Sequence, residues 1–293
     1  LPGEGLDGAA VIRGAGAGPY GAGALTGVVA LREAGAREGL TALSVSAAER
    51  GGLRAAAAFG TEHLLVTVSG SSTDGYRPVR GARAGAADTP TTLEDASLAA
   101  RLQGARDGVD WAVRLGAFEE RRGAGLAGAR SIASGGSLTL TAARAPRDGE
   151  SGWRVQAWLR SSDLKNSSAA VGAGRAFTTP ANDQYATPAL GYGLNAAWQG
   201  RGQAWSWEVG ADARFTQGEA RERFRYQGAA FTRGRESGGR TSVGGIYAEL
   251  VRDQGDLLLT GGARIDAWRQ SGAIRRERDL ATGALTLNKP STD

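Results

Sequence analysis

The chain has 293 residues, of which 41% are hydrophobic and 22% are charged, and this composition is not that of a disordered protein. It has no cysteine, which excludes disulfides, iron–sulfur clusters and thiolate metal sites. The net charge of +5 comes almost entirely from arginines spread among acidic residues. No motif typical of nucleic-acid binding accompanies them, so we expect no nucleic-acid partner.

The sequence has no apolar run of about 18 residues or more, which excludes a membrane-spanning helix but leaves a membrane-spanning β-barrel open. It contains no methionine, and its first residues, LPGEGLDGAA, lack the basic and apolar regions of a signal peptide. We therefore expect the chain to be an internal piece of a longer protein.

Residues 11–31, VIRGAGAGPYGAGALTGVVAL, contain the spacing G-x-G-x-x-G. A dinucleotide-binding turn needs a helix directly after these glycines. Here Gly21, Gly23 and Gly27 would lie inside that helix, where each glycine costs about 1 kcal/mol relative to alanine. The segment ends in residues 28–31, VVAL, which are typical of a strand. The sequence therefore does not favour a dinucleotide site.

From residue 40 onward, apolar residues recur with a period of two, which predicts β-strands. The clearest case is 205–216, where one phase is apolar and the other is polar or small. The apolar phase consists of Trp205, Trp207, Val209, Ala211, Ala213 and Phe215. Similar patterns predict further strands at 40–48, 53–59, 63–70, 97–105, 109–118, 137–144, 153–160, 190–199, 242–252, 257–268 and 281–288.

Tight connections alternate with long polar stretches along the chain. The tight connections are at 106–108, 146–152, 199–203 and 253–255, and the long stretches are at 71–96, 119–136, 161–189 and 217–241. This alternation predicts an antiparallel up-and-down sheet, with turns at one rim and large loops at the other.

Periodicity alone does not decide whether the apolar phase faces a soluble core or lipid. The strand lengths, near the about 9–11 residues that span a bilayer, favour lipid. Aromatic residues also lie at strand ends, where an interfacial girdle forms: Trp111, Trp153, Trp198 and Trp205. In this arrangement the polar phase lines a wet or protein-filled lumen.

The opening segment has an ordered set of small and aromatic residues: Arg13-Gly14, Tyr20-Gly21, Gly23, Ala24 and Gly27-Val28-Val29. It resembles the end of the plug domain of TonB-dependent outer-membrane receptors, where these elements occur in the same order. It departs from the family pattern at Ala15, where proline often stands, and at Gly18-Pro19. The stretches at 73–78, TDGYRP, and 244–268, GGIYAELVRDQGDLLLTGGARIDAW, are similar to barrel strands of the same family.

The resemblance implies an all-β fold, an antiparallel transmembrane β-barrel that follows the C-terminal end of a plug domain. Residues 1–34 would form the plug end and 35–293 the N-terminal part of the barrel, about half of a 22-stranded one. It also implies a transporter in the cell outer membrane rather than an enzyme, with no cofactor. Its expected partners are TonB, through a segment missing from this chain, outer-membrane lipid and lipopolysaccharide, and a small-molecule substrate such as a ferric siderophore.

Two other classes stay open at this stage. A passive porin-type channel would lack the glycine-rich plug segment and would have a constriction loop instead. A secreted β-rich adhesin or solenoid would show a repeat every 20 to 30 residues or so, and the sequence contains none.

Three sets of candidate site residues follow. Arg13 and Glu249 are predicted to face each other across the plug–barrel interface, unless Glu249 is only a solvated lumen residue. The plug-motif residues Gly14, Tyr20, Gly21 and Gly27 are included, of which the glycines are expected to serve backbone geometry. Within 217–241, a basic and aromatic ligand-binding loop is predicted from Arg221, Arg223, Arg225, Tyr226 and Phe231.

These loop arginines have an equally good alternative interpretation, in which they meet lipopolysaccharide phosphates or simply solvate the loop. His63 is the only histidine, so the sequence offers neither a His-rich metal site nor a serine–histidine catalytic arrangement. No metal site is expected.

Overall fold

The computed structural model describes residues 3–13, 27–34, 41–147 and 149–290, apart from the side chain of Arg13. A short 3-10 helix, η1 (Gly3–Gly5), precedes a two-stranded antiparallel sheet of β1 (Leu6–Arg13) and β2 (Gly27–Glu33). None of the helices in the described ranges is long and apolar enough to cross a membrane.

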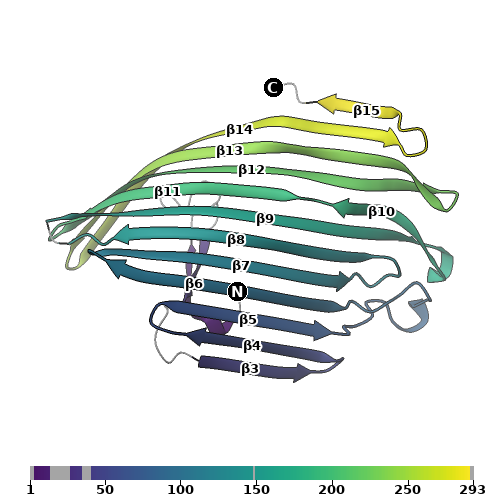
Figure 1. Ribbon diagram of the computed structural model, residues 1–293, viewed down its shortest axis with the longest axis horizontal. Coiled ribbons are helices and arrows are strands. Elements are labelled where there is room, and N and C mark those ends of the chain that lie inside the picture. The colour runs from purple at the N-terminus through teal and green to yellow at the C-terminus, as the bar shows by residue number, and fades with distance from the viewer. Residues whose placement is uncertain (1–2, 14–26, 35–40, 148, 291–293) are drawn as a thin grey trace.

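The other strands form one 13-stranded antiparallel sheet (Figure 1). They are β3 (Thr41–Ala48), β4 (Gly52–Gly60), β5 (Leu64–Thr73), β6 (Leu93–Arg106), β7 (Val109–Gly123), β8 (Arg130–Arg144), β9 (Ser151–Val171), β10 (Thr178–Ala186), β11 (Ala189–Arg201), β12 (Trp205–Gln227), β13 (Ala230–Gln254), β14 (Leu257–Asp279) and β15 (Leu285–Pro290). Neighbours in sequence are neighbours in the sheet, with β3 and β15 at its edges, so the predicted up-and-down order is confirmed. The exception is that β10 and β11 share the place between β9 and β12.

The strand β10 lies inside the stretch 161–189, which the sequence predicts as a loop, and that prediction is wrong. Proline has no backbone N–H, so Pro188 cannot continue the ladder of hydrogen bonds. The backbone N–H of Thr187 instead donates a 2.6 Å hydrogen bond to Asp163 Oδ1 of β9. The break thus divides one position of the sheet into two strands.

The predicted loops at 119–136 and 217–241 are also largely strand. β7 runs to Gly123 and β8 begins at Arg130, while β12 and β13 leave only Gly228 and Ala229 between them. In these extensions both phases carry charged and polar residues, so the apolar period of two is lost and the sequence resembles a loop. The segment 74–92 is the long connection that keeps its loop character, with one 3-10 turn, η3 (Gly81–Arg83).

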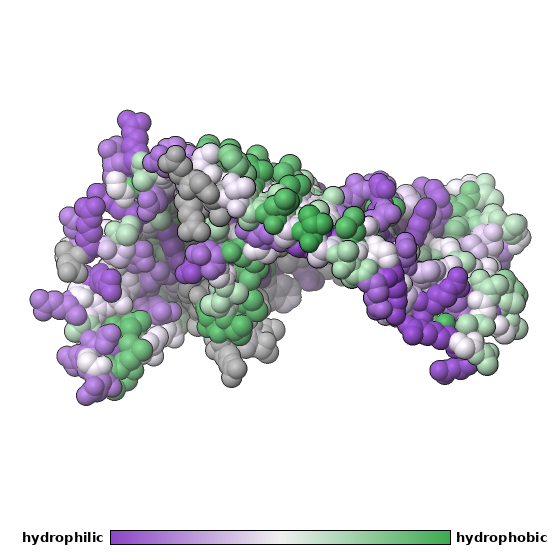
Figure 2. Space-filling model, turned by 90° about the horizontal axis from the view of Figure 1, so that it is seen from below, coloured by the Kyte–Doolittle hydropathy of each residue, from purple (hydrophilic) through white to green (hydrophobic). Residues whose placement is uncertain are grey.

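The cross-strand register extends the two faces seen at 205–216, one apolar and one polar, to the other strands of the sheet. Residues directly opposite each other share a face, and Val209 lies opposite both Trp198 of β11 and Ala248 of β13. Large apolar side chains of this phase are exposed on strands from β3 to β14: Leu43, Val45, Phe59, Val68, Leu98, Leu115, Leu140, Leu159, Leu194, Trp198, Val209, Ile246, Leu250 and Ile265. Figure 2 shows hydrophobic residues gathered in a band on the upper surface, with hydrophilic residues towards both ends.

The sheet has almost no large apolar core. Apart from Leu65 and Tyr247, the buried hydrophobic residues of the described chain are all alanines. The exposed apolar phase therefore does not pack against a second layer of this chain, and it forms an unpartnered wall surface.

Candidate functional site on the inner face

The β1–β2 hairpin and η1 lie against one face of the 13-stranded sheet, which we call the inner face. Their contacts with the wall involve Ser44, Arg54, Thr67, Arg101 and Arg114. Register assigns all five residues to the polar phase, opposite to that of Trp207. The apolar phase consequently points to the outer side.

Glu4 in η1 makes the first contact between hairpin and wall. Its Oε1 and Oε2 accept hydrogen bonds from the two terminal nitrogens of Arg54 at 2.9 and 3.0 Å, and Ser44 Oγ donates a third at 2.5 Å. These bonds, led by that of Arg54, lower the pKa of Glu4 to about 2. The Glu4 side chain keeps an exposed fraction of 15%, so the carboxylate is held close against the wall.

Glu33 at the end of β2 makes the second contact. Its Oε1 accepts a 2.9 Å hydrogen bond from Arg114 Nε of β7, and its Oε2 lies 3.8 Å from Arg101 Nη1 of β6. Directly across the hairpin end, the N–H of Ala34 donates to the carbonyl of Gly5 at 2.9 Å. The two carboxylates therefore fix both strands of the hairpin to the inner face through arginines.

A second charged network covers the inner face of the later strands. Glu208 Oε1 of β12 accepts hydrogen bonds of 2.6 Å from both Arg154 Nη2 and Tyr247 Oη. Nearby, Arg264 of β14 forms a 2.7 Å ion pair with Asp212 of β12 and retains only 6% side-chain exposure. These pairs cross from β9 to β14 on the polar phase, so they fix the relative positions of strands in the wall.

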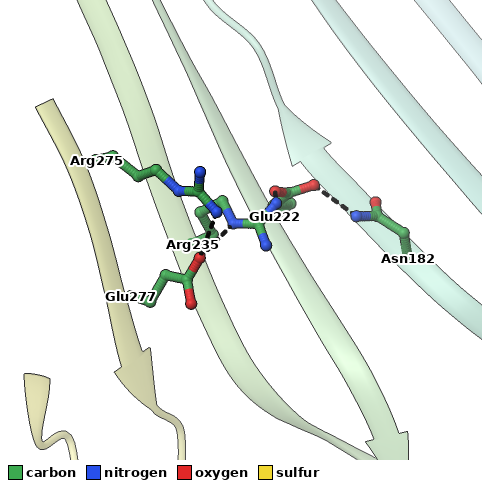
Figure 3. Close-up of polar contacts among 5 residues, drawn as sticks. All are labelled: Asn182, Glu222, Arg235, Arg275 and Glu277. Carbon is green, nitrogen blue, oxygen red and sulfur yellow. Dashed lines mark hydrogen bonds and ion pairs between the residues drawn. The ribbon is translucent and has the colours of Figure 1, made fainter. Parts of the chain in front are cut away.

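A third cluster lies in the strand extensions beyond the apolar band (Figure 3). Arg235 of β13 bridges Glu222 at 2.7 Å and Glu277 at 2.9 Å, which lie on the strands at its two sides. Glu222 also accepts a 2.5 Å bond from Asn182 of β10, and Glu277 accepts one of 3.1 Å from Arg275. The cluster joins four strands where few apolar contacts hold them.

The connections at the same rim are tied together by Asp88. This carboxylate is fully buried and is held by Arg175 of η4 (Ala173–Arg175), with Nε to Oδ2 at 2.9 Å and Nη2 to Oδ1 at 2.5 Å. The N–H of Gly85 donates a further bond at 2.8 Å, and these bonds lower the pKa of Asp88 to about 2. The loop 74–92 is thereby attached to the connection between β9 and β10.

No family model and no curated protein matches the sequence, but solved structures match the fold. The copper transporter OprC is similar, with a TM-score of 0.70 and 16% identity over 93% of this chain and 47% of that one. The ferric yersiniabactin uptake receptor FyuA from Yersinia pestis has a TM-score of 0.70 and 12% identity, over 97% of this chain and 47% of that one. The FrpB iron transporter from Neisseria meningitidis has a TM-score of 0.65 and 16% identity, over 94% of this chain and 50% of that one. The chain has the fold of a TonB-dependent receptor barrel.

The match confirms the predicted all-β fold class and agrees, at the level of the fold, with the resemblance seen in the sequence. The chain spans about half the length of the receptors that it matches. The two-stranded sheet ends at residue 33, and the wall begins at residue 41. The prediction that a plug domain ends at residue 34 stays a prediction.

The structure describes only some of the predicted plug and interface residues. Gly14, Tyr20 and Gly21 lie outside the described residues. Gly27 begins β2, and its backbone pairs with that of Arg13, whose side chain is not described. Glu249 is half-buried on the inner phase of β13, opposite Glu208 of β12. The pairing of Arg13 with Glu249 stays a prediction.

The predicted ligand-binding loop is not a loop. Arg221, Arg223, Arg225 and Tyr226 lie in β12, and Phe231 lies in β13. Alternation places Arg221 and Arg223 on the phase of Trp207, where they pair with Glu219 and Asp183. Tyr226 and Phe231 pack edge to face at the hairpin tip, with centroids 5.2 Å apart. Ligand contact by these five residues stays a prediction.

Sequence reasoning misses the residues that do hold the hairpin. Glu4 and Glu33 flank the hairpin strands, and their arginine partners lie on the polar phase of early strands. The sequence contained part of this information, because Arg54, Arg101 and Arg114 are cations in the polar phase, which is expected to line a wet or protein-filled lumen. The pairing itself depends on how the hairpin crosses the wall, which no periodicity encodes. Within the described ranges, no group of three His, Cys, Asp or Glu side chains is placed to hold a metal ion.

Proposed function

We propose that the chain forms the plug end and the first part of the barrel wall of an outer-membrane receptor that imports a scarce solute with energy supplied through TonB. The observation that carries the proposal is the docking of the glycine-rich hairpin on the polar face by Glu4 and Glu33. A hairpin attached inside the wall obstructs the lumen, and an obstructed lumen needs an energised step to pass solute.

The outer face supports a location in the outer membrane. Its large side chains are apolar and exposed, and Trp205 and Trp198 lie at the ends of their strands, as in an aromatic girdle. Contact with lipid is favourable for such an apolar surface, whereas contact with water is not. Outer-membrane lipid and lipopolysaccharide are therefore the proposed neighbours of this face.

The substrate is proposed to be a small molecule such as a ferric chelate. The solved structures that match include a copper transporter, an iron transporter and a ferric yersiniabactin uptake receptor, whose names give metals or a metal chelate as the substrate. Arg221, Arg223, Arg225, Tyr226 and Phe231 form a basic and aromatic hairpin at the loop-bearing rim, which would attract an anionic chelate. We also retain the proposal that Arg13 and Glu249 contribute to plug retention.

A passive channel is the competing function. It predicts solute flux that does not depend on TonB, and it gives the docked hairpin no role. A chain whose inner face makes three ion pairs and a serine hydrogen bond to a docked hairpin fits this function poorly.

The test is an uptake assay on the receptor that carries this chain. Expressed in an iron-starved Gram-negative host without its own siderophore receptors, it should support growth on a panel of ferric siderophores only when TonB is present. Growth that is equal with and without TonB would favour the passive channel. Glu249→Ala should increase antibiotic leakage if the Arg13 contact retains the plug.

A further inference from the structure

A cavity of about 330 Å³ opens in the wall beside the hairpin contact. It is lined by residues of β7, β8 and β9 that include Arg114, Thr139, Trp158 and Arg160. This volume falls within the range of about 300–1,000 Å³ that is usual for small-molecule sites. We call this cavity the wall pocket.

Register brings the chemistry of the wall pocket onto one face. Thr139 of β8 lies directly opposite both Arg114 of β7 and Trp158 of β9, and Ser137 lies opposite Arg160. These residues belong to the polar phase, so they point to the same inner side as the hairpin. Two guanidinium groups, two hydroxyls and one indole ring thus surround one space.

The Trp158 ring lies at the edge of this space, over two glycines of β11. A Cβ atom at Gly193 would lie 2.8 Å from Trp158 Cε2, and one at Gly191 would lie 3.3 Å from its Cζ3. The glycines let the indole lie flat along the wall. The ring therefore offers a broad apolar surface at the border of the pocket.

The charge of the wall pocket is positive and only partly compensated. Arg160 is exposed and has no ion pair with any described residue. Arg114 Nε donates a hydrogen bond to Glu33. Its Nη1 would lie 3.4 Å from a Cβ atom added at Gly116, the residue directly opposite Ser137. Arg114 is thus shared between the hairpin and the pocket.

We propose that the wall pocket binds an anionic group of a ligand, a carboxylate or a phosphate, and that this anion competes with Glu33 for Arg114. The inference rests on the proposed function, because it assigns the ligand to the inner side of a receptor wall. Arg160 and Arg114 donate charge-assisted hydrogen bonds to the anion, and Trp158 covers an apolar part of the ligand. Binding then weakens one of the two carboxylate contacts that hold the hairpin.

Linkage makes the competition testable from both sides. If the bound anion competes with Glu33 for Arg114, loss of the Glu33 charge should strengthen anion binding.

The experiment uses the receptor that carries this chain, purified in detergent, with citrate as the probe and glucose as a neutral control. Calorimetric titration measures citrate affinity in the wild type, Arg160→Gln, Glu33→Gln and Arg276→Gln. Arg276 is the matched control, because it is also exposed without an ion pair but lies on the outer phase of β14, opposite Glu236. Glucose should not bind to any of them.

We expect Arg160→Gln to weaken citrate binding about tenfold or more, and Glu33→Gln to strengthen it about fivefold or more. Arg276→Gln should leave the affinity unchanged. Equal affinity in the wild type and Arg160→Gln, or no gain in Glu33→Gln, overturns the proposal. Each variant should keep the wild-type melting temperature of the barrel, which separates a binding effect from misfolding.

The hairpin supplies a second readout that does not depend on affinity. Because this chain has no cysteine, Leu31→Cys on β2 and Leu115→Cys on the outer phase of β7 can carry a pair of spin labels. Saturating citrate should broaden the distance distribution between them, whereas an unchanged distribution overturns the competition. These measurements contain no TonB, so their failure leaves the uptake assay intact, and failure of TonB-dependent uptake leaves citrate binding intact.

Discussion

Glu33 and Arg114 are joined by a 2.9 Å hydrogen bond although they lie 81 positions apart in the sequence. Their side chains keep exposed fractions of only 13% and 25%. Removing one partner of such a pair leaves the other charge poorly solvated, so the pair holds the hairpin more firmly than an exposed ion pair does. Together with Glu4 and Arg54, it determines where the hairpin sits on the wall.

Glu33→Gln should loosen β2 from the wall. The variant loses the charged part of its contacts with Arg114 and Arg101, worth about 2 kcal/mol, so amide exchange in β2 should accelerate at least about tenfold. Asp7→Asn is the control, since the Asp7–Arg32 pair lies within the hairpin and both side chains are more than half exposed. Hydrogen-exchange mass spectrometry measures both. Equal protection in Glu33→Gln and the wild type would contradict the role given to this residue.

Hairpin docking should depend on pH through Glu4. Its pKa falls from 4.5 to about 2 on docking, chiefly through the hydrogen bond from Arg54. Because the carboxylate has a lower pKa in the docked state, its ionisation stabilises docking when the pH is above the undocked pKa. This stabilisation is lost as the pH falls towards 2. Exchange of the hairpin amides, corrected for intrinsic rates, should therefore increase as the pH is lowered from 4.5 to 2. Glu4→Gln should show less of this increase, and an identical profile would contradict the assignment.

The strands with an apolar phase were predictable because their side chains alternate between lipid-type and lumen-type surroundings. The stretch 205–216 is one example, and its register with β11 follows the predicted tight connection at 199–203. The extensions of β12 and β13 were not predictable in this way. Both of their faces carry charges, and they are held by cross-strand ion pairs such as Arg235 with Glu277, which leave no apolar period.

The candidate site was less predictable than the fold. The plug motif indicated that residues 11–31 belong inside a barrel, and this stays a prediction. The docking pairs, however, join residues far apart in sequence, such as Glu4 and Arg54, and depend on the path of the hairpin. Trp158 is an instance of a residue that fits the apolar pattern poorly because it belongs to the inner phase, where it covers Gly193.

Asp88→Asn should release the loop 74–92. The substitution keeps the size of the side chain but removes the charge that accepts the hydrogen bonds of Arg175. Limited proteolysis should cleave both this loop and the connection at 172–177 faster than in the wild type. Arg83→Gln, an exposed arginine in the same loop, should leave cleavage unchanged. If both variants are cleaved at the wild-type rate, Asp88 does not hold these connections.

Gly193→Ala should displace the indole of Trp158. The added methyl would meet Trp158 Cε2 at 2.8 Å and the carbonyl oxygen of Ala213 at 2.7 Å, so the ring and the local wall must shift. We expect a loss of about 1–3 kcal/mol of stability and a lower melting temperature. Gly202→Ala is the control, because its nearest atom is 3.8 Å away. An equal decrease in melting temperature for the two variants would show that the clash at Gly193 does not destabilise the wall.

In the receptor that we propose, the phase of Trp207 and Val209 faces lipid, whereas the phase of Glu208 and Arg214 faces the lumen. The most direct test attaches a fluorophore to single cysteines introduced at 207, 208, 209 and 214 of the receptor, reconstituted in bilayers of brominated lipid. Bromine quenches only fluorophores in the acyl region, so strong quenching is expected at 207 and 209 and weak quenching at 208 and 214. The reverse pattern, or equal quenching at all four positions, would contradict this orientation of the two faces.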